Sequence, residues 1–320
     1  MDDFEAARAA ARANAENLIE KFRDGFCRDT DGWRLERADE EFLAQITQRK
    51  ICGRALLSNE QVRRRAQYAM IDAALDAYRE HPGRQWLWIT VCWDRGVTWE
   101  REPDIDVISL RRIVYGHLER CGLHGFGIVE VDTWKNLTDE PGRRMVAHSH
   151  FLGYPSDGGI VGIKRLESDL CQRRALGNST NARSVVIKPM ILAPADFAWI
   201  GQYMFKCPAY AKRPVPREIG GGIRLVSAEH AQGSAARLVE VVSRLEVGDV
   251  MFSIGGGSEI AKKVRAEVAH EIRDRRVARH APTRDEVDRH WRRIREMNGS
   301  NMFREQRIVA RQQDRMRESD

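Results

Sequence analysis

The spacing of hydrophobic residues changes twice along the chain. In residues 1–83 the apolar positions recur at helical intervals, and the segment ends at His81-Pro82-Gly83, a sequence that breaks helices. From residue 84 to about 215, short apolar or alternating runs typical of strands are interleaved with helical spacing. Helical spacing then returns. We therefore expect a helical N-terminal region (1–83), a mixed domain (84–215) and a helical C-terminal region (216–320).

The middle region predicts strands and helices in the order β-α-β-β-α-β-α. The predicted strands are 86–93 (WLWITVCW), 125–132 (GFGIVEVD), 144–152 (RMVAHSHFL) and 182–190 (ARSVVIKPM), and the predicted helices are 105–121, 163–174 and 194–206. The first six elements have the order of the split βαβ, or ferredoxin-like, antiparallel sheet. The predicted fold class is therefore α+β, with this sheet flanked by the two helical regions. In that topology the second and third strands are adjacent and antiparallel.

The composition is that of a globular protein, with 42% hydrophobic and 31% charged residues. No apolar run is long enough to cross a bilayer, and the acidic start MDDFEAARAA is not a signal peptide. We therefore expect a cytoplasmic protein without a membrane partner. The six cysteines are scattered singly, with no C-x-x-C pair, which argues against a cysteine-rich zinc module.

The positive charge is concentrated near the C-terminus. From Ala261 onward there are 17 Lys and Arg against 11 Asp and Glu, an excess of six that equals the net charge of the whole chain. Such a segment favours contact with phosphates, although a solvated helix face of mixed charge has the same composition. Gly255-Gly256-Gly257-Ser258 precedes a helix, but the lysines after it do not follow the spacing of a phosphate-binding loop. We therefore expect no ATPase motor, and we expect the glycines at 220–222 and 255–257 to be linkers.

Two histidines and two carboxylates are predicted to meet on one face of the sheet. His148 and His150 are two residues apart on a strand, as are Glu130 and Asp132 on the preceding one. An antiparallel turn near residue 140 places residue 130 opposite residue 148 or 150, on the same face. Two imidazoles and at least one carboxylate would then converge on one spot, a set of ligands that suits Mg²⁺ or Mn²⁺. The alternative is a pair of histidines packed in a strand, and the role of Asp132 is open.

The helix predicted at 194–206 carries Tyr203 and Lys206 one turn apart. A tyrosine hydroxyl beside a metal-polarised phosphate can act as a nucleophile and form a phosphotyrosine ester. A nearby lysine can offset negative charge or help to activate the phenol. The apolar stripe of this helix, which includes Phe197 and Gly201, lies roughly opposite Tyr203. We therefore expect the helix to be covered on two faces.

With these motifs in order, the sequence resembles the HUH endonucleases, in particular the rolling-circle replication initiators of plasmids and phages. The resemblance covers residues 84–212 and rests on the strand around Thr90, on His148-Ser149-His150 and on the Y-x-x-K motif that begins at Tyr203. Many members take a third metal ligand from the strand before the histidine pair, and Glu130 matches that position. Ser149 departs from the family, in which the residue between the histidines is usually bulky and apolar.

The resemblance implies a metal-dependent, site-specific nickase and strand transferase that initiates rolling-circle DNA replication through a 5′-phosphotyrosine intermediate. It implies Tyr203 as nucleophile, Lys206 as its helper, single-stranded or hairpin origin DNA as substrate, and a separate helicase and polymerase as partners. Tyr210 follows seven residues later, beyond Pro208, so a single nucleophile is favoured. The alternatives are an HUH-type transposase, or a non-catalytic DNA-binding regulator on the same scaffold.

Overall fold

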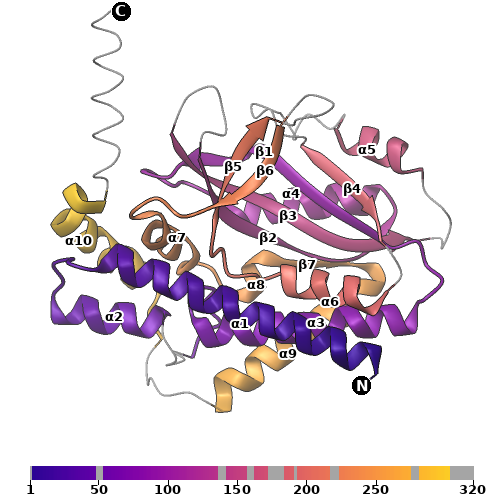
Figure 1. Cartoon of the computed structure of the whole chain (residues 1–320), viewed down its shortest axis with the longest axis horizontal. Coiled ribbons are helices and arrows are strands. Elements are labelled where there is room, and N and C mark those ends of the chain that lie inside the picture. Colours follow the sequence, from indigo (N-terminus) through magenta and orange to yellow (C-terminus); the bar gives the residue numbers. More distant parts are fainter. Residues whose placement is uncertain are drawn as a thin grey trace, which may run out of the picture.

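In the computed structural model a helical layer covers one side of a long sheet (Figure 1). The structure describes residues 2–47, 53–135, 142–156, 162–171, 184–190, 193–216, 223–274 and 281–302. The α-helices are α1 (Asp3–Thr30), α2 (Arg37–Thr47), α3 (Glu60–Glu80), α4 (Val107–Arg120), α5 (Ile163–Cys171), α6 (Pro194–Tyr203), α7 (Ser234–Val242), α8 (Val247–Val250), α9 (Ser258–Asp274) and α10 (Arg284–Met302). Helix α6 contacts both α1 and α3, and α3 also contacts α9.

The described strands form one sheet in the order β4-β1-β3-β2-β5-β6, and β7 also pairs with β2. The strands are β1 (Leu87–Trp99), β2 (Leu123–Lys135), β3 (Arg143–Pro155), β4 (Val185–Pro189), β5 (Ala211–Pro216), β6 (Ile223–Ala228) and β7 (Met251–Ile254). The pairs β4–β1, β1–β3 and β3–β2 are antiparallel. The long strands β1, β2 and β3 therefore form the centre of the sheet.

The predicted α+β class is confirmed, but the sheet is mixed rather than antiparallel throughout. Strands and helices occur in the predicted order β1, α4, β2, β3, α5, β4, α6, and β2 and β3 are adjacent and antiparallel as expected. However, β5 pairs with β2 in parallel, through Trp134 and Lys212. The prediction of a wholly antiparallel sheet is therefore wrong. The physical reason is that the outer edge of β2 has further backbone groups to pair, and β5 and β7 bind there.

The prediction that the chain is helical after residue 215 is also wrong in part. The segments β6 and β7 are strands, and β7 pairs with Gly125 to Ile128 of β2. The glycines 255–257, expected to be a linker, form a 3-10 turn packed on the sheet, where a Cβ on Gly257 would lie 1.8 Å from the carbonyl oxygen of Gly125. Only glycine allows this approach. The glycines 220–222 lie outside the described residues.

The hydrophobic core is continuous across the three predicted regions. Buried side chains from α3, from β3 and from α10, such as Met70, Phe151 and Trp291, belong to one packed cluster. The boundaries near residues 83 and 215 stay predictions. Of the basic C-terminal segment, residues 275–280 and 303–320 are outside the described part of the chain. Among the described helices, none combines the length and the apolar character needed to span a membrane.

Candidate metal centre and the tyrosine beside it

The register of β2 and β3 brings the predicted ligands together. Glu130 lies directly opposite His148, as one of the two pairings expected from the sequence. His150 lies two residues further along β3 and opposite Thr90 of β1. Residues opposite one another in an antiparallel pair share a face, as do residues two apart on a strand. Glu130, His148 and His150 therefore project from the same side of the sheet.

These three side chains form a group that can hold a metal ion. One ligand atom from each lies within 4.8 Å of the others, and all three residues are buried. The distance from Glu130 Oε2 to His150 Nε2 is 3.5 Å, and to His148 Nε2 it is 3.8 Å. These separations suit ligands around a common central ion, because metal–ligand bonds of about 2.0–2.2 Å place neighbouring ligand atoms about 3 Å or more apart.

The unpaired atoms of the group fit a cation. His150 Nε2 and Glu130 Oε1 are buried and have no hydrogen-bond partner among the residues that the structure describes. The other ring nitrogens are engaged, since His148 Nδ1 lies 3.4 Å from the carbonyl oxygen of Val146 and His150 Nδ1 lies 3.0 Å from Thr90 Oγ1. A carbonyl oxygen only accepts hydrogen bonds, so the ring proton of His148 is on Nδ1. The lone pair on His148 Nε2 then faces Glu130 and His150.

Burial keeps the imidazoles in the form that binds metals. It lowers the pKa of His148, and it lowers the pKa of His150 to about 4, so both rings are neutral at pH 7. Burial alone would raise the pKa of Glu130, but the charge of Lys206 and the approach of the two histidines outweigh it. The pKa of Glu130 therefore lies well below its usual range, and this side chain is a carboxylate.

Lys206 and Asp132 contribute one positive and one further negative charge to the site. The ammonium of Lys206 pairs with Glu130 and lies 3.7 Å from Asp132 Oδ2. Burial opposes the charged form of Lys206, but the two carboxylates raise its pKa above the ordinary value. Asp132 Oδ2 lies 3.8 Å from His148 Nε2, although Asp132 is outside the three-residue group. Two carboxylates and one ammonium leave a net charge of about −1, which favours a cation.

Tyr203 is the last residue of α6, so the prediction that the helix extends to Lys206 is wrong. Met204 leaves the helical conformation, and Phe205 has a left-handed φ of 60°. Burial of the Met204 and Phe205 side chains stabilises this turn. Lys206 reaches Tyr203 through the turn rather than along a helix face: its backbone N–H donates to the Tyr203 carbonyl oxygen at 3.3 Å, and Nζ lies 4.1 Å from the Tyr203 ring centroid.

The Tyr203 ring faces the histidines. Its centroid lies 4.9 Å from that of His150, with the rings at 80° to one another. The opposite side of α6 packs on α3, where a Cβ on Gly201 would lie 2.6 Å from the Cα of Ile71. Helix α6 is thus covered on two faces as expected, because α3 packs on the apolar stripe and Tyr203 contacts Trp88 and His150 of the sheet on the other side. The lysine charge lowers the pKa of Tyr203, but burial, Glu130 and Asp132 together raise it, so the phenol is protonated at pH 7.

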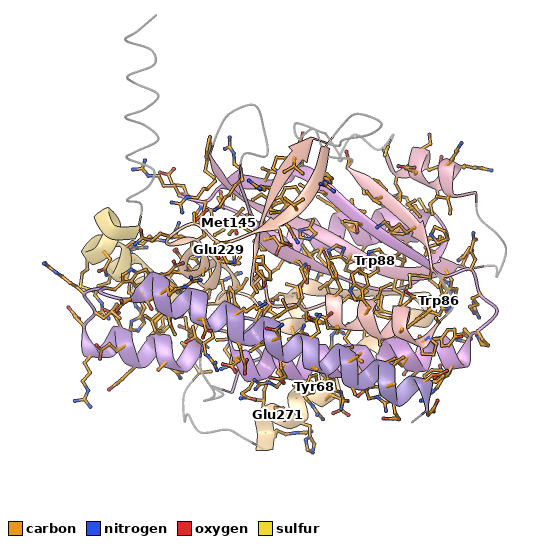
Figure 2. All side chains as sticks on the ribbon, viewed as in Figure 1. Tyr68, Trp86, Trp88, Met145, Glu229 and Glu271 are labelled. Carbon is orange, nitrogen blue, oxygen red and sulfur yellow. The ribbon has the colours of Figure 1, made fainter. Side chains whose placement is uncertain are left out.

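Two tryptophans of the site were not singled out from the sequence. Trp88, labelled in Figure 2, stacks on His150 at 5.0 Å with an interplanar angle of 9°. Trp199 is 49% exposed, and its ring lies 4.9 Å from that of Tyr203. The signals were present: Trp88 precedes Thr90 by two residues on a strand, and Trp199 precedes Tyr203 by four on a helix.

A surface cavity leads to the tyrosine. It has a volume of about 230 Å³, and its lining includes Trp199, Tyr203, Lys206, Tyr210 and Lys212. Tyr210 is held at the rim, where the Lys21 ammonium donates a hydrogen bond to its hydroxyl at 2.7 Å. The cavity therefore places exposed aromatic and cationic side chains beside Tyr203 and Lys206, the two lining residues that contact the metal group.

No protein-family model matches the sequence, and the comparisons with curated proteins and with solved structures found no similar protein.

Proposed function

We propose that this chain is a metal-dependent, site-specific single-strand DNA endonuclease and strand transferase that initiates rolling-circle replication through a 5′-phosphotyrosine intermediate. The observation that carries the proposal is the position of Tyr203, whose ring packs against His150 of the candidate metal group. A half-buried phenol beside two neutral imidazoles and a carboxylate suits attack on a phosphodiester. Lys206, paired with Glu130, would offset the charge that develops on the phosphate.

The proposal includes an HUH-type, ferredoxin-like scaffold. The strand order β4-β1-β3-β2, with antiparallel pairing at each step, supports it. Strands β5, β6 and β7 would then be additions at the outer edge of β2. The resemblance rests in part on the strand around Thr90, and the hydrogen bond between Thr90 and His150 supports a role for Thr90 in orienting that ring.

In the proposed reaction the Tyr203 oxygen attacks the scissile phosphorus. The new bond joins the tyrosine oxygen to phosphorus, the bond from phosphorus to the 3′-oxygen breaks, and the phenolic proton passes in net to that oxygen. A Mg²⁺ or Mn²⁺ ion held by Glu130, His148 and His150 would polarise the phosphate. The free 3′-hydroxyl can prime synthesis, and the 5′ end stays on the protein for later transfer.

Unpaired DNA is the proposed substrate. Trp199 offers an exposed ring for base stacking beside Tyr203, and Lys212 lines the same cavity. A single-stranded segment, or the loop of an extruded hairpin, exposes the base faces that such stacking needs. The proposed partners are origin DNA and a separate helicase and polymerase.

The test is formation of a covalent adduct. Full-length protein is incubated with labelled single-stranded oligonucleotides tiled across the DNA around its own gene, with Mn²⁺ or Mg²⁺, and resolved on a denaturing gel. Wild type and the matched control Tyr210→Phe should form an adduct, and Tyr203→Phe and His148→Ala should not. An adduct in Tyr203→Phe would refute the assigned nucleophile, and no adduct with the wild type would favour a non-catalytic regulator.

A further inference from the structure

A second cavity lies apart from the metal centre. It has a volume of about 560 Å³ and is enclosed by the segment 101–105 after β1, by residues 237–245 and by α10. Its charged lining includes Arg101, Arg237, Arg244, Arg284, Arg295 and Glu240. None of the proposed metal ligands, nor Tyr203 or Lys206, lines it.

Among the described residues that line this cavity, arginines outnumber acids. Glu240 is fully buried and is shared by three guanidinium groups, those of Arg237, Arg244 and Arg295. Arg244 has a second acidic partner in Asp288. Among the described lining residues there are five arginines and three acids, a formal excess of two positive charges that Asp288 reduces from outside the lining. The cavity therefore keeps a modest positive excess.

Neighbouring positive charges also change the pKa values of the arginines. Burial and then the charge of Arg295 lower the pKa of Arg237 to about 9, with Arg244 adding to the shift and Glu100 opposing it. Burial and the charge of Arg244 also lower the pKa of Arg295. A bound anion would remove the mutual repulsion that contributes to these shifts.

The deepest guanidinium is fixed in place before any ligand binds. Arg237 Nε donates to the carbonyl oxygen of Glu100 at 3.2 Å, and its Nη2 donates to that of Arg101 at 2.8 Å. A side chain held in this way loses little conformational entropy on binding. The cavity is thus both cationic and partly pre-organised.

We infer that this cavity binds a phosphate group, carried either by a free nucleotide or by a DNA strand. Several guanidinium groups suit phosphate in particular, because each of its oxygens can accept from a different fork. The volume lies in the range of about 300–1,000 Å³ that is usual for small-molecule sites, so a nucleotide fits as well as one backbone phosphate of a strand. This function does not depend on the chemistry proposed for Tyr203.

The test compares two exposed arginines of α10. Arg284 lines the cavity and Arg289 does not, so Arg284→Glu is the test variant and Arg289→Glu its matched control. Arg101→Glu changes the opposite wall in the same way. In EDTA, the full-length proteins are titrated with deoxyadenosine triphosphate by calorimetry, and with a fluorescent duplex of arbitrary sequence by anisotropy at several salt concentrations.

The two arms distinguish the sources of phosphate. If a free nucleotide is the ligand, its affinity falls by about tenfold or more in Arg284→Glu and Arg101→Glu and stays within about twofold in Arg289→Glu. If a DNA strand is the ligand, the nucleotide does not bind. The affinity for the duplex then falls in Arg284→Glu and Arg101→Glu but not in Arg289→Glu. In the same two variants, the slope of log affinity against log salt concentration falls by about one. Wild type that binds neither probe, or an equal loss in Arg289→Glu, overturns the inference.

Discussion

Thr90 Oγ1 on β1 lies 3.0 Å from His150 Nδ1 on β3, so a strand outside the ligand group orients one of its imidazoles. Thr90→Val keeps the shape of the side chain and removes this hydrogen bond. Because such outer partners fix ring orientation and tautomer, we expect Mn²⁺ affinity to fall by about 10–100-fold, measured by calorimetry. Thr98→Val, on the same strand, is the control and should bind Mn²⁺ as the wild type does.

Glu130 and Asp132 share a face, but only Glu130 belongs to the three-residue group. Glu130→Gln should abolish measurable Mn²⁺ binding, because it removes a charged ligand and leaves the lysine ammonium in the site. Asp132→Asn should weaken binding less, through loss of charge alone. Calorimetry under identical conditions compares the two variants. Equal losses would show that Asp132 is itself a ligand.

Lys206 pairs with the Glu130 carboxylate that the proposed metal would use. Lys206→Met removes a positive charge from beside the site, so Mn²⁺ affinity should rise by about tenfold or more. The rate of adduct formation should fall, because the charge that offsets the phosphate is lost. The opposite directions of these two changes separate a role in the reaction from simple support of metal binding. A fall in both quantities would mean that Lys206 mainly organises the ligands.

Trp199 is 49% exposed beside Tyr203, whereas Trp99 is 44% exposed and has the Arg144 guanidinium over its ring. If Trp199 stacks on a base, Trp199→Ala should weaken the binding of a single-stranded oligonucleotide by about 1–3 kcal/mol. Fluorescence anisotropy with the Tyr203→Phe protein measures this without cleavage. Trp99→Ala is the matched control for loss of an exposed indole, and a similar loss there would argue against a specific platform.

Asp39 on α2 is fully buried and bonds to Arg293 and His290 of α10. Burial alone would raise its pKa, but these two partners lower it below the ordinary value. A depressed carboxyl pKa contributes stability above the unfolded value of about 3.9, and that stability is lost as the pH falls through the folded value.

Asp39→Asn should therefore lower the free energy of unfolding by about 1.5–3 kcal/mol at pH 7, with a smaller difference at pH 3. Urea denaturation at the two pH values gives the comparison. Glu41→Gln, which changes an exposed acid of the same helix, should have an effect near zero. A difference for Asp39→Asn that is constant with pH would mean that the ionisation of this carboxyl does not contribute.

Much of the fold could be predicted because its signals are local. The alternation of apolar residues predicts the strands around Glu130 and His148, and the short connection between them makes these strands neighbours. When the numbers of two paired residues add to an even number, as for Glu130 and His148, even-numbered residues of one strand lie opposite even-numbered residues of the other. The short strands β6 and β7 could not be predicted in this way. Six-residue IRLVSA and four-residue MFSI have little periodicity of their own, and β7 forms because β2 offers it unpaired backbone groups.

The sequence by itself determined which residues could meet: side chains two apart on a strand share a face, so His148, His150 and Glu130 were expected together. Only the tertiary structure decided where Tyr203 points. The sequence places the apolar stripe of α6 opposite Tyr203 but does not say which neighbour packs on it; in the structure α3 packs there, with a close approach at Gly201. The direction of a side chain on a helix buried on two sides depends on which neighbour packs on each face, and that neighbour lies more than a hundred residues away in the chain.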